Sequence, residues 1–298
     1  MPVSAPSAAT CPGCTAPLQG EILLRGHDRL MGGPGVFAVL RCSECGLVST
    51  QPRIGPEQFA EYYPVGYQRE PRASLVERAR LGAIIRFGPY RALGRRRPGR
   101  LLDVGCGNGE LARAFARSGW QVAGVEPGSE AAAHARAGGV EVHCGTLEDA
   151  PWQGPSFDAV IFNHSLEHVP DPVLSLRQAA ALLRAGGVVA VGVPNFGCWQ
   201  RRVFRARWFQ LDLPRHLQHL DARTLGALLV RAGLRPVERT SVSMRPSLLM
   251  SLQYALFGRA RWMGRGLRLG AWALAPLLLV LDRFVAGDCL HMLAVKDA

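Results

Sequence analysis

The spacing of apolar residues changes repeatedly from residue 100 onward. Short apolar runs predict strands at 100–105, 121–126, 140–145, 157–162, 187–193, 234–240 and 289–296. Helix-like stretches between them predict helices at 109–118, 128–137, 171–184 and 221–232. Alternation at this spacing is typical of a doubly wound, mostly parallel sheet with helices on both faces. We therefore expect an α/β, Rossmann-like domain with a seven-stranded sheet over residues 100–298.

Two insertions interrupt this pattern, at 194–220 and 241–287. Both are too long for simple connections, and we expect helical lids that cover the site. The second holds two uncharged stretches, 246–258 and 269–281, each shorter than the roughly 20 residues that span a bilayer. They predict either buried lid helices or a peripheral membrane contact through 246–281.

Residues 1–50 form a separate predicted unit. Two strand-like runs around a Gly/Pro-rich stretch predict a hairpin with a C-x-x-C pair at each end. Four thiolates in this pattern suit a closed, structural zinc site, and a redox role for one pair is the alternative. The predicted ligands are Cys11, Cys14, Cys42 and Cys45. Three cysteines outside the motifs, Cys144, Cys198 and Cys289, have no partner pattern.

Residues 51–99 form a connector with an aromatic run, a predicted helix near 73–87 and a basic linker. The net charge of +12 rests almost wholly on arginine, since Lys296 is the single lysine, which fits codon bias as well as a polyanionic partner. The first ten residues lack the basic and apolar regions of a signal peptide. We predict a cytoplasmic protein, with the inner face of the membrane as the site of any peripheral contact.

The stretch "LLDVGCGNGE" places Gly105, Gly107 and Gly109 just after Asp103, at the first strand-to-helix turn. In such a sheet this turn lies at the carboxyl edge, where ligands bind. Glycines let the backbone approach a ligand closely, and the helix amino end offers free N–H groups. Glu110 occupies the place of the third glycine of a dinucleotide-binding turn, and a P-loop ending is absent from the sequence.

This motif, with Glu126 closing the second strand, resembles the class I S-adenosylmethionine-dependent methyltransferases that carry an N-terminal four-cysteine zinc unit. The resemblance implies S-adenosylmethionine as cofactor. It places the turn, including Cys106, at the amino-acid end of the cofactor and Asp103 beside its ammonium group. Glu126 would accept hydrogen bonds from both ribose hydroxyls, a role that suits an acceptor-only carboxylate.

Two further segments extend the resemblance. "CGTLEDAPW" resembles the adenine-side loop, with Thr146 and Leu147 flanking the adenine. "NHSLEHVPDP" resembles the motif after the fourth strand, where Asn163 lines the methyl pocket and His164 lies beside it.

The Glu-His pair that recurs in the family corresponds to Glu167 and His168, with either a structural or a catalytic role. Some quinone-pathway relatives bind a divalent ion with a carboxylate three residues earlier. His164 stands there in this chain, and hard cations prefer oxygen ligands, so the sequence does not predict a magnesium site.

"LDLPRHLQHLD" resembles a segment of the zinc-unit subgroup and suits a substrate-facing turn. His titrates near neutral pH, so His216 is the first candidate proton acceptor, with His219 as its nearest rival, and His164 is the second candidate catalytic residue. Arg215, Tyr63 and Tyr67 are candidate substrate contacts. Ordinary packing is the alternative for the tyrosines.

The sequence thus predicts a methyltransferase acting on a small-molecule, glycan or lipid-linked acceptor, at a hydroxyl oxygen. A nucleic-acid methyltransferase and a non-catalytic cofactor-binding module are the alternatives. The amino-methylating enzymes of nucleic acids usually carry Asn/Asp-Pro-Pro-aromatic after the fourth strand, where this chain has "NHSL". The intact glycine motif disfavours the non-catalytic module.

Overall fold

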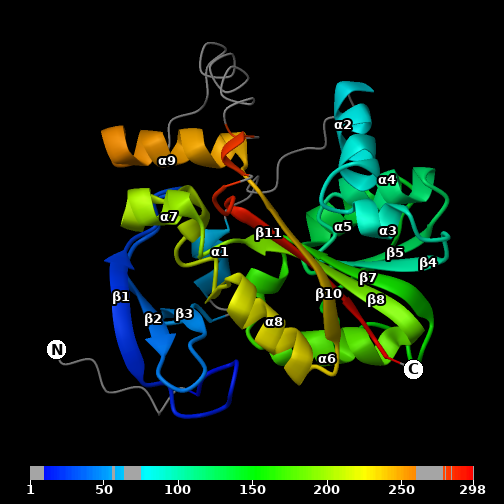
Figure 1. Cartoon of the computed structure of the whole chain (residues 1–298), viewed down its shortest axis with the longest axis horizontal. Coiled ribbons are helices and arrows are strands. Elements are labelled where there is room, and N and C mark those ends of the chain that lie inside the picture. The colour runs from blue at the N-terminus through cyan, green and yellow to red at the C-terminus, as the bar shows by residue number, and fades with distance from the viewer. Residues whose placement is uncertain are drawn as a thin grey trace.

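A computed structural model describes residues 10–55, 58–63, 75–259, 278, 280–282 and 284–297. Two sheets organise these residues, and they lie side by side in Figure 1. The larger has seven strands in the order β10-β11-β8-β7-β4-β5-β6, and the smaller has the order β1-β2-β3-β9. In the larger sheet β8, β7, β4, β5 and β6 run parallel, while β11 is antiparallel to β8 and β10. The predicted fold is confirmed.

The strands are β1 (Gly20–Gly26), β2 (Phe37–Cys42), β3 (Val48–Gln51), β4 (Arg100–Val104), β5 (Gln121–Glu126), β6 (Glu141–Cys144), β7 (Phe157–Asn163), β8 (Leu183–Pro194), β9 (Gln218–His219), β10 (Arg235–Val242) and β11 (Cys289–Val295). The α-helices are α1 (Phe59–Tyr62), α2 (Leu75–Arg86), α3 (Arg91–Gly94), α4 (Glu110–Arg117), α5 (Ser129–Ala137), α6 (Pro172–Leu182), α7 (Trp199–Phe204), α8 (Ala222–Arg231) and α9 (Arg245–Phe257). Short 3-10 helices include η2 (Leu166–His168) and η4 (Phe209–Leu211).

The central strands are apolar on both sides because helices cover both faces of the sheet. Leu102 and Val160 share one core cluster with residues of α6 and α8. Leu101 and Ile161 belong to another cluster with residues of α2, α3 and α4. The helices of the sheet therefore sit where the alternation of strands and helices placed them.

Local signals set the helix starts. The Asp171 carboxylate accepts from the Leu174 amide, and Pro172 opens α6. Asp221 and Thr224 form a capping box at the start of α8. The predicted helix 171–184 was wrong at its end: α6 ends at Leu182 and β8 begins at the next residue.

The smaller sheet joins distant parts of the chain. The β1–β2 pair is the predicted antiparallel hairpin, and β3 follows the second cysteine pair. The fourth strand, β9, comes from the 194–220 insertion, with His219 opposite Val48 and Gln218 opposite Ser49. This insertion thus completes the sheet of the N-terminal unit, which the sequence did not predict.

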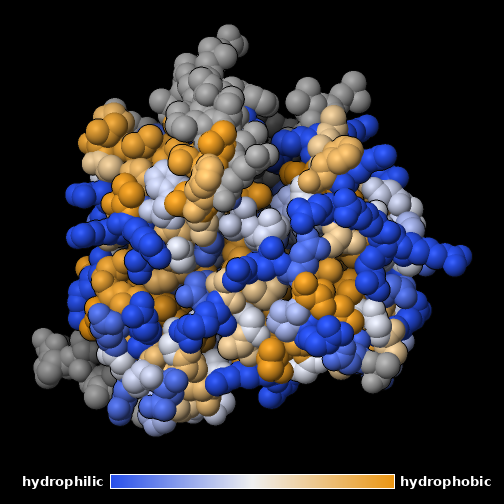
Figure 2. Space-filling view, viewed as in Figure 1, coloured by the Kyte–Doolittle hydropathy of each residue, from blue (hydrophilic) through white to orange (hydrophobic). Residues whose placement is uncertain are grey.

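Among the described residues, no helix has the length and apolar character needed to cross a bilayer. The stretch 246–258 largely coincides with α9, whereas most of 269–281 lies outside the described residues. On α9, Leu249 and Tyr254 are buried, while Leu256 and Phe257 are exposed. Figure 2 shows apolar side chains gathered around α9, at the upper left of the view. The buried residues fit the predicted lid helix, and the exposed apolar residues fit the predicted membrane contact.

Candidate active site

The turn between β4 and α4 has the backbone that its glycines permit. Gly105, Gly107 and Gly109 have φ of +75°, +52° and +74°, values that favour glycine. A Cβ on Gly105 would lie 2.5 Å from Cβ of Ser165, so this position is closely packed. A Cβ on Gly107 would have no neighbour within 4 Å among the described residues, so this part of the turn faces open space. The turn can therefore accept a ligand against its backbone.

Two buried carboxylates flank this turn. Asp103 is 1% exposed, and its Oδ1 has no hydrogen-bond partner among the described residues. Burial, with the nearby charge of Glu126, raises the pKa of Asp103 to about 7. Glu126 accepts hydrogen bonds of 2.8 Å from the amides of Gly107 and Gly128. An unsatisfied acid on one side and a fixed carboxylate on the other fit a ligand with a cationic group and neutral hydroxyls.

The loop after β6 is held beside Glu126. The amide of Gly145 donates to the Glu126 carbonyl at 3.1 Å. The Thr146 amide and hydroxyl both donate to Oδ1 of Asp149, at 2.6 and 3.0 Å. Leu147 packs against the main core cluster. The sequence did not single out Asp149, which fixes the shape of this loop.

The carboxyl end of β7 meets the same turn. The Ser165 hydroxyl donates to the Val104 carbonyl at 2.5 Å, which ties the end of β7 to the glycine turn. Asn163 accepts at Oδ1 from the Tyr90 hydroxyl at 2.7 Å. Cys106 is buried beside Gly124, where an added Cβ would lie 2.6 Å from its Sγ. The predicted cofactor residues therefore lie together along one edge of the sheet.

His164 sits in a chain of polar contacts. Its Nδ1 lies 3.4 Å from Oε1 of Glu167, and its Nε2 lies 3.4 Å from Sγ of Cys289. Cys289 is also 3.2 Å from Nε2 of His291. Burial opposes the charged form of His164, but Cys289 and Glu167 outweigh this and raise its pKa well above the ordinary value. Burial likewise opposes ionisation of Glu167, but its histidine neighbours, His164 first, lower its pKa to about 2.

The "LDLPRHLQHLD" segment contacts η2 and faces the protein interior rather than solvent. His216 is 6% exposed, and its Nδ1 lies 2.9 Å from the Gln210 carbonyl. Burial lowers the pKa of His216 to about 4, so the ring is neutral at physiological pH. His168 lies beside it, with the ring centroids 4.7 Å apart. The Tyr63 hydroxyl is 3.2 Å from Nδ1 of His168, whereas Tyr67 lies outside the described residues.

Arg215 is 1% exposed and bound to two carboxylates. Its NH1 and NH2 donate to the two oxygens of Asp28 at 2.9 and 2.7 Å, and NH2 also donates to Asp212 at 2.7 Å. Burial acts to lower the pKa of Arg215, but the two acids raise it above its ordinary value. The guanidinium thus joins the loop after β1 to the 194–220 insertion. A direct contact with substrate stays a prediction.

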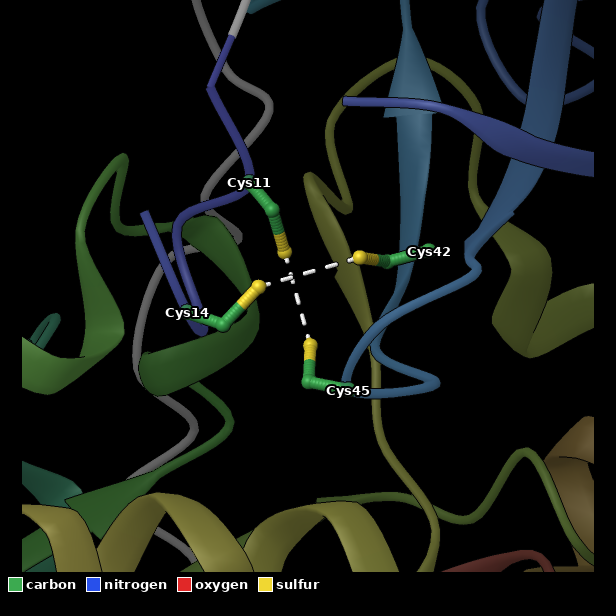
Figure 3. Close-up of side chains that lie close together, drawn as sticks. All are labelled: Cys11, Cys14, Cys42 and Cys45. Carbon is green, nitrogen blue, oxygen red and sulfur yellow. Dashed lines mark hydrogen bonds between the residues drawn. The ribbon is translucent and has the colours of Figure 1, made fainter. Parts of the chain in front are cut away.

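The four predicted zinc ligands converge (Figure 3). Sγ of Cys11 lies 3.5 Å from Sγ of Cys45, and Sγ of Cys14 lies 3.8 Å from Sγ of Cys42. Tetrahedral zinc with Zn–S bonds of about 2.3 Å needs sulfur pairs about 3.8 Å apart. The sulfurs are therefore spaced for one ion. The guanidinium of Arg231 on α8 contacts the Gly13 carbonyl, which holds this unit against the main domain.

Comparison with known proteins agrees with this geometry. Residues 75–239, more than half of the chain, match the methyltransferase domain family. The chain belongs to this family.

Two relatives of this methyltransferase are named ubiquinone biosynthesis O-methyltransferase. The protein of Rhizobium johnstonii is 32% identical over 159 residues, which cover 49% of this chain and 64% of that protein. The protein of Xanthomonas axonopodis pv. citri is 36% identical over 149 residues, which cover 46% and 62%. The chain thus spans less than two thirds of the length of either relative.

Among solved structures, a SAM-dependent methyltransferase from Thermotoga maritima has a TM-score of 0.51 with this methyltransferase, at 20% identity. The match covers 81% of this chain and 98% of that chain, and it shows the shared fold.

Besides Asp149, sequence reasoning missed two residues of the candidate site, Cys289 and Asp28. Cys289 had no partner pattern, because its contacts with His164 and His291 depend on the pairing of β11 with β8. Asp28 lies in a loop 187 residues from Arg215, and no local pattern announces the pair. The signal that could have found Asp28 is an acid before a Gly-rich stretch, which is too common to be specific.

Proposed function

We propose that this protein is an S-adenosylmethionine-dependent methyltransferase that methylates a hydroxyl oxygen of a small-molecule acceptor. The observation that carries the proposal is the pair of buried carboxylates around the glycine turn. Asp103 would face the cofactor's ammonium group, with Gly105, Cys106, Gly107 and Gly109 along its amino-acid end. Glu126 would take both ribose hydroxyls, and Thr146 and Leu147 would flank the adenine. The cofactor supplies an activated methyl group, so the protein's main task is to align the acceptor oxygen with that methyl group.

The acceptor would lie at the carboxyl end of β7, with Asn163 lining the methyl pocket. The partly exposed ring of His164, held by Glu167, would contact the acceptor oxygen. His216 has a neutral ring and stays the first candidate proton acceptor. Tyr63 and Arg215 would support this wall of the pocket through His168 and Asp28. Glu167 and His168 would act as positioning residues, a role that these contacts support.

The acceptor class is a phenol or quinone precursor first, given the names of the relatives, and a glycan or lipid-linked hydroxyl second. A lipid-linked acceptor fits the exposed Leu256 and Phe257 on α9, which would also give the protein a peripheral contact at the inner membrane face. Binding to anionic liposomes at low salt tests that contact. A nucleic-acid acceptor is disfavoured by the "NHSL" motif.

The cysteine unit would hold one structural zinc ion. Four sulfur ligands close the coordination sphere, so the ion would stabilise the fold and leave the reaction to other groups.

The test is transfer of a labelled methyl group from S-adenosylmethionine to a panel of phenols, polyprenylated phenols, saccharides and a short nucleic-acid duplex. We expect labelling of a hydroxylated small molecule, lost in His164→Ala while cofactor binding remains. Labelling of the duplex alone would favour the nucleic-acid enzyme. Cofactor binding without transfer to any acceptor, including a lysate fraction, would favour the non-catalytic module.

A further inference from the structure

A cysteine and two histidines meet beside the end of β7. Sγ of Cys289 lies 3.4 Å from Nε2 of His164 and 3.2 Å from Nε2 of His291. Cys289 and His291 are 2% and 8% exposed. The side chain of His164 is 31% exposed, so the cluster is buried on the β11 side and reaches the surface through this ring.

The pairing of strands brings the three side chains together. Cys289 and His291 are two residues apart on β11, so their side chains lie on the same face of the sheet. His291 is opposite Gly192 of β8, and the Gly192 carbonyl accepts from the His164 amide at 2.8 Å. A Cβ on Gly192 would lie 2.8 Å from Cε1 of His291, so the missing side chain leaves room for that ring. Backbone contacts therefore hold both rings around one sulfur.

Glu167 completes a series of three groups that is typical of nucleophilic cysteines. Nδ1 of His164 lies 3.4 Å from Oε1 of Glu167, which is 1% exposed. The carboxylate favours a proton on Nδ1 and leaves Nε2 to take the proton of the thiol. A nucleophile within reach of a base, with the base oriented by a third group, is the diagnostic arrangement for covalent chemistry. Cys289, His164 and Glu167 have this arrangement.

The charges around the sulfur favour the thiolate. Burial acts to raise the pKa of Cys289, but the charges and hydrogen bonds of His291 and His164 outweigh it and lower this pKa to about 6. Two acids border the cluster: Tyr90, whose ring centroid lies 5.3 Å from that of His291, and Asp288, the residue before Cys289. Burial and the charge of Cys289 raise the pKa of both acids, so Tyr90 stays neutral and Asp288 is partly protonated near neutral pH.

We propose that Cys289 is a nucleophilic site, activated by His164 and Glu167, that adds to an electron-poor alkene of the quinone class. His164 takes the thiol proton, and the sulfur electron pair forms a C–S bond at a ring carbon of the quinone. The electrons of the ring double bond pass to a carbonyl oxygen, to which His164 delivers the proton. The hydrogen on the attacked carbon moves to the second oxygen. The product is a hydroquinone thioether that holds every atom of both reactants, so the quinone is reduced without a further reductant.

The choice of electrophile rests on the proposed function, whereas the nucleophile does not. The first acceptor class proposed above is a phenol or quinone precursor, and oxidation of a dihydroxyphenol gives a quinone of similar size. Such a molecule would enter the acceptor side, where the exposed edge of His164 leads to Cys289. The adduct would occupy the acceptor side and stop methyl transfer, so the site would also make the enzyme sensitive to an oxidised acceptor.

The first test is the pH dependence with which N-ethylmaleimide labels Cys289 in the zinc-loaded full chain, followed by peptide mass spectrometry. Between pH 6.5 and 7.5 we expect the labelling rate to rise less than about twofold, because the thiolate already predominates. Glutathione, a free thiol of ordinary pKa, should react about tenfold faster over the same interval. A tenfold rise for Cys289, or no labelling of Cys289 while glutathione reacts, would overturn the proposal.

Two variants separate activation of the thiol from access to it. His164 has a left-handed backbone with φ of +54°, which asparagine tolerates, so His164→Asn removes the base with little change in the backbone. The labelling rate of Cys289 should then rise at least about threefold between pH 6.5 and 7.5. Cys198→Ala removes a buried thiol whose pKa burial raises to about 12, and it should leave the shallow profile unchanged. Unchanged S-adenosylhomocysteine affinity shows that each variant is folded, and a shallow profile in His164→Asn would overturn the assigned base.

A second test adds one equivalent of 1,4-benzoquinone at pH 6.5 and maps the adduct. We expect an adduct on Cys289 whose mass is the sum of the peptide and one whole quinone, formed more slowly in His164→Asn. Maleimide labelling of Cys289 without a quinone adduct would overturn the quinone class. Failure of the proposed function would be seen separately, as absent cofactor binding or absent methyl transfer by the unlabelled protein.

Discussion

The two halves of the candidate site are built in different ways. The predicted cofactor residues all fall between Asp103 and Asn163, in one run of alternating strands and helices. The acceptor side draws on Asp28, Tyr63, η2 and the 194–220 insertion, which are far apart in the chain. The predicted cofactor residues are placed by one continuous strand-helix segment, whereas the acceptor side depends on contacts between segments far apart in the sequence. The two halves should therefore fail separately when they are mutated.

Thr50 is the link that makes the acceptor side depend on the cysteine unit. It follows the second cysteine pair in β3, and its amide donates to the Leu217 carbonyl at 3.0 Å. The amide of Leu217 in turn donates to the Glu167 carbonyl at 2.8 Å. A disturbance of the cysteine unit should therefore reach η2 through two backbone hydrogen bonds.

The largest effect is expected for Cys42→Ser, which removes a proposed zinc ligand. Structural zinc is worth on the order of 10 kcal/mol in isolated zinc-binding peptides, so loss of the site should unfold the smaller sheet. We expect methyl transfer to be lost, while S-adenosylhomocysteine affinity stays within about threefold because the cofactor half shares no ligand with this unit. Calorimetry and the transfer assay measure the two outcomes.

Cys144→Ser is the control for this variant, because Cys144 is exposed at the end of β6. It should change neither zinc content nor transfer. Full methyl transfer by zinc-free Cys42→Ser would show that the acceptor side does not depend on the cysteine unit.

A smaller effect, on the free energy of unfolding, is expected for Asp28→Ala. This variant removes the carboxylate whose two oxygens both accept hydrogen bonds from buried Arg215. Removing one partner of a buried ion pair costs about 3–5 kcal/mol, because the remaining charge keeps its desolvation penalty. Urea unfolding measures the loss. The control is Glu21→Ala, which breaks the exposed pair of Glu21 with Arg41 and should cost less than about 1 kcal/mol. Equal losses in the two variants would show that Arg215 does not anchor the acceptor side.

The smallest effect is a pH dependence confined to the cofactor half. With a pKa of about 7, Asp103 is mostly protonated at pH 6 in the free protein. A cofactor ammonium beside it would favour the carboxylate, so binding at pH 6 should release close to one proton, and the release should shrink as the pH rises through 7. Calorimetry in buffers of different ionisation enthalpy counts the protons.

Asp103→Asn should abolish this proton release, and the nearby charge of Glu126 would remain. Proton uptake on binding at pH 6, or the same release in Asp103→Asn, would show that Asp103 does not contact the ammonium group.

Local signals in the sequence were sufficient for the sheet and for the placement of the predicted cofactor residues. Strand and helix periods, the glycine turn and the capping residues are local signals, and the structure places Asp103, Gly107 and Glu126 together as they indicate. The hairpin and the convergence of the four cysteines were also predictable, because paired C-x-x-C motifs constrain their own geometry.

The acceptor half could not be predicted in the same way. The sequence assigned Arg215 and His216 to a substrate-facing turn, but β9 pairs with β3 and turns this segment inward. A strand of two residues is too short to show an alternating hydrophobic pattern in the sequence. The ion pair of Asp28 with Arg215 and the contact of Cys289 with His164 likewise exist only after distant strands have paired.

The most direct test of the central claim is calorimetric binding of S-adenosylhomocysteine to Glu126→Ala. Loss of a carboxylate that accepts two hydroxyl donors should weaken binding by about 1.5–3 kcal/mol per charged hydrogen bond, at least tenfold overall. Glu130→Ala, an exposed acid in the first turn of α5, should bind like the wild type. Tenfold or greater weakening confined to Glu126→Ala, with unchanged zinc content, is the predicted result. Wild-type affinity in Glu126→Ala, or no binding by the folded wild type, would contradict the assigned cofactor site.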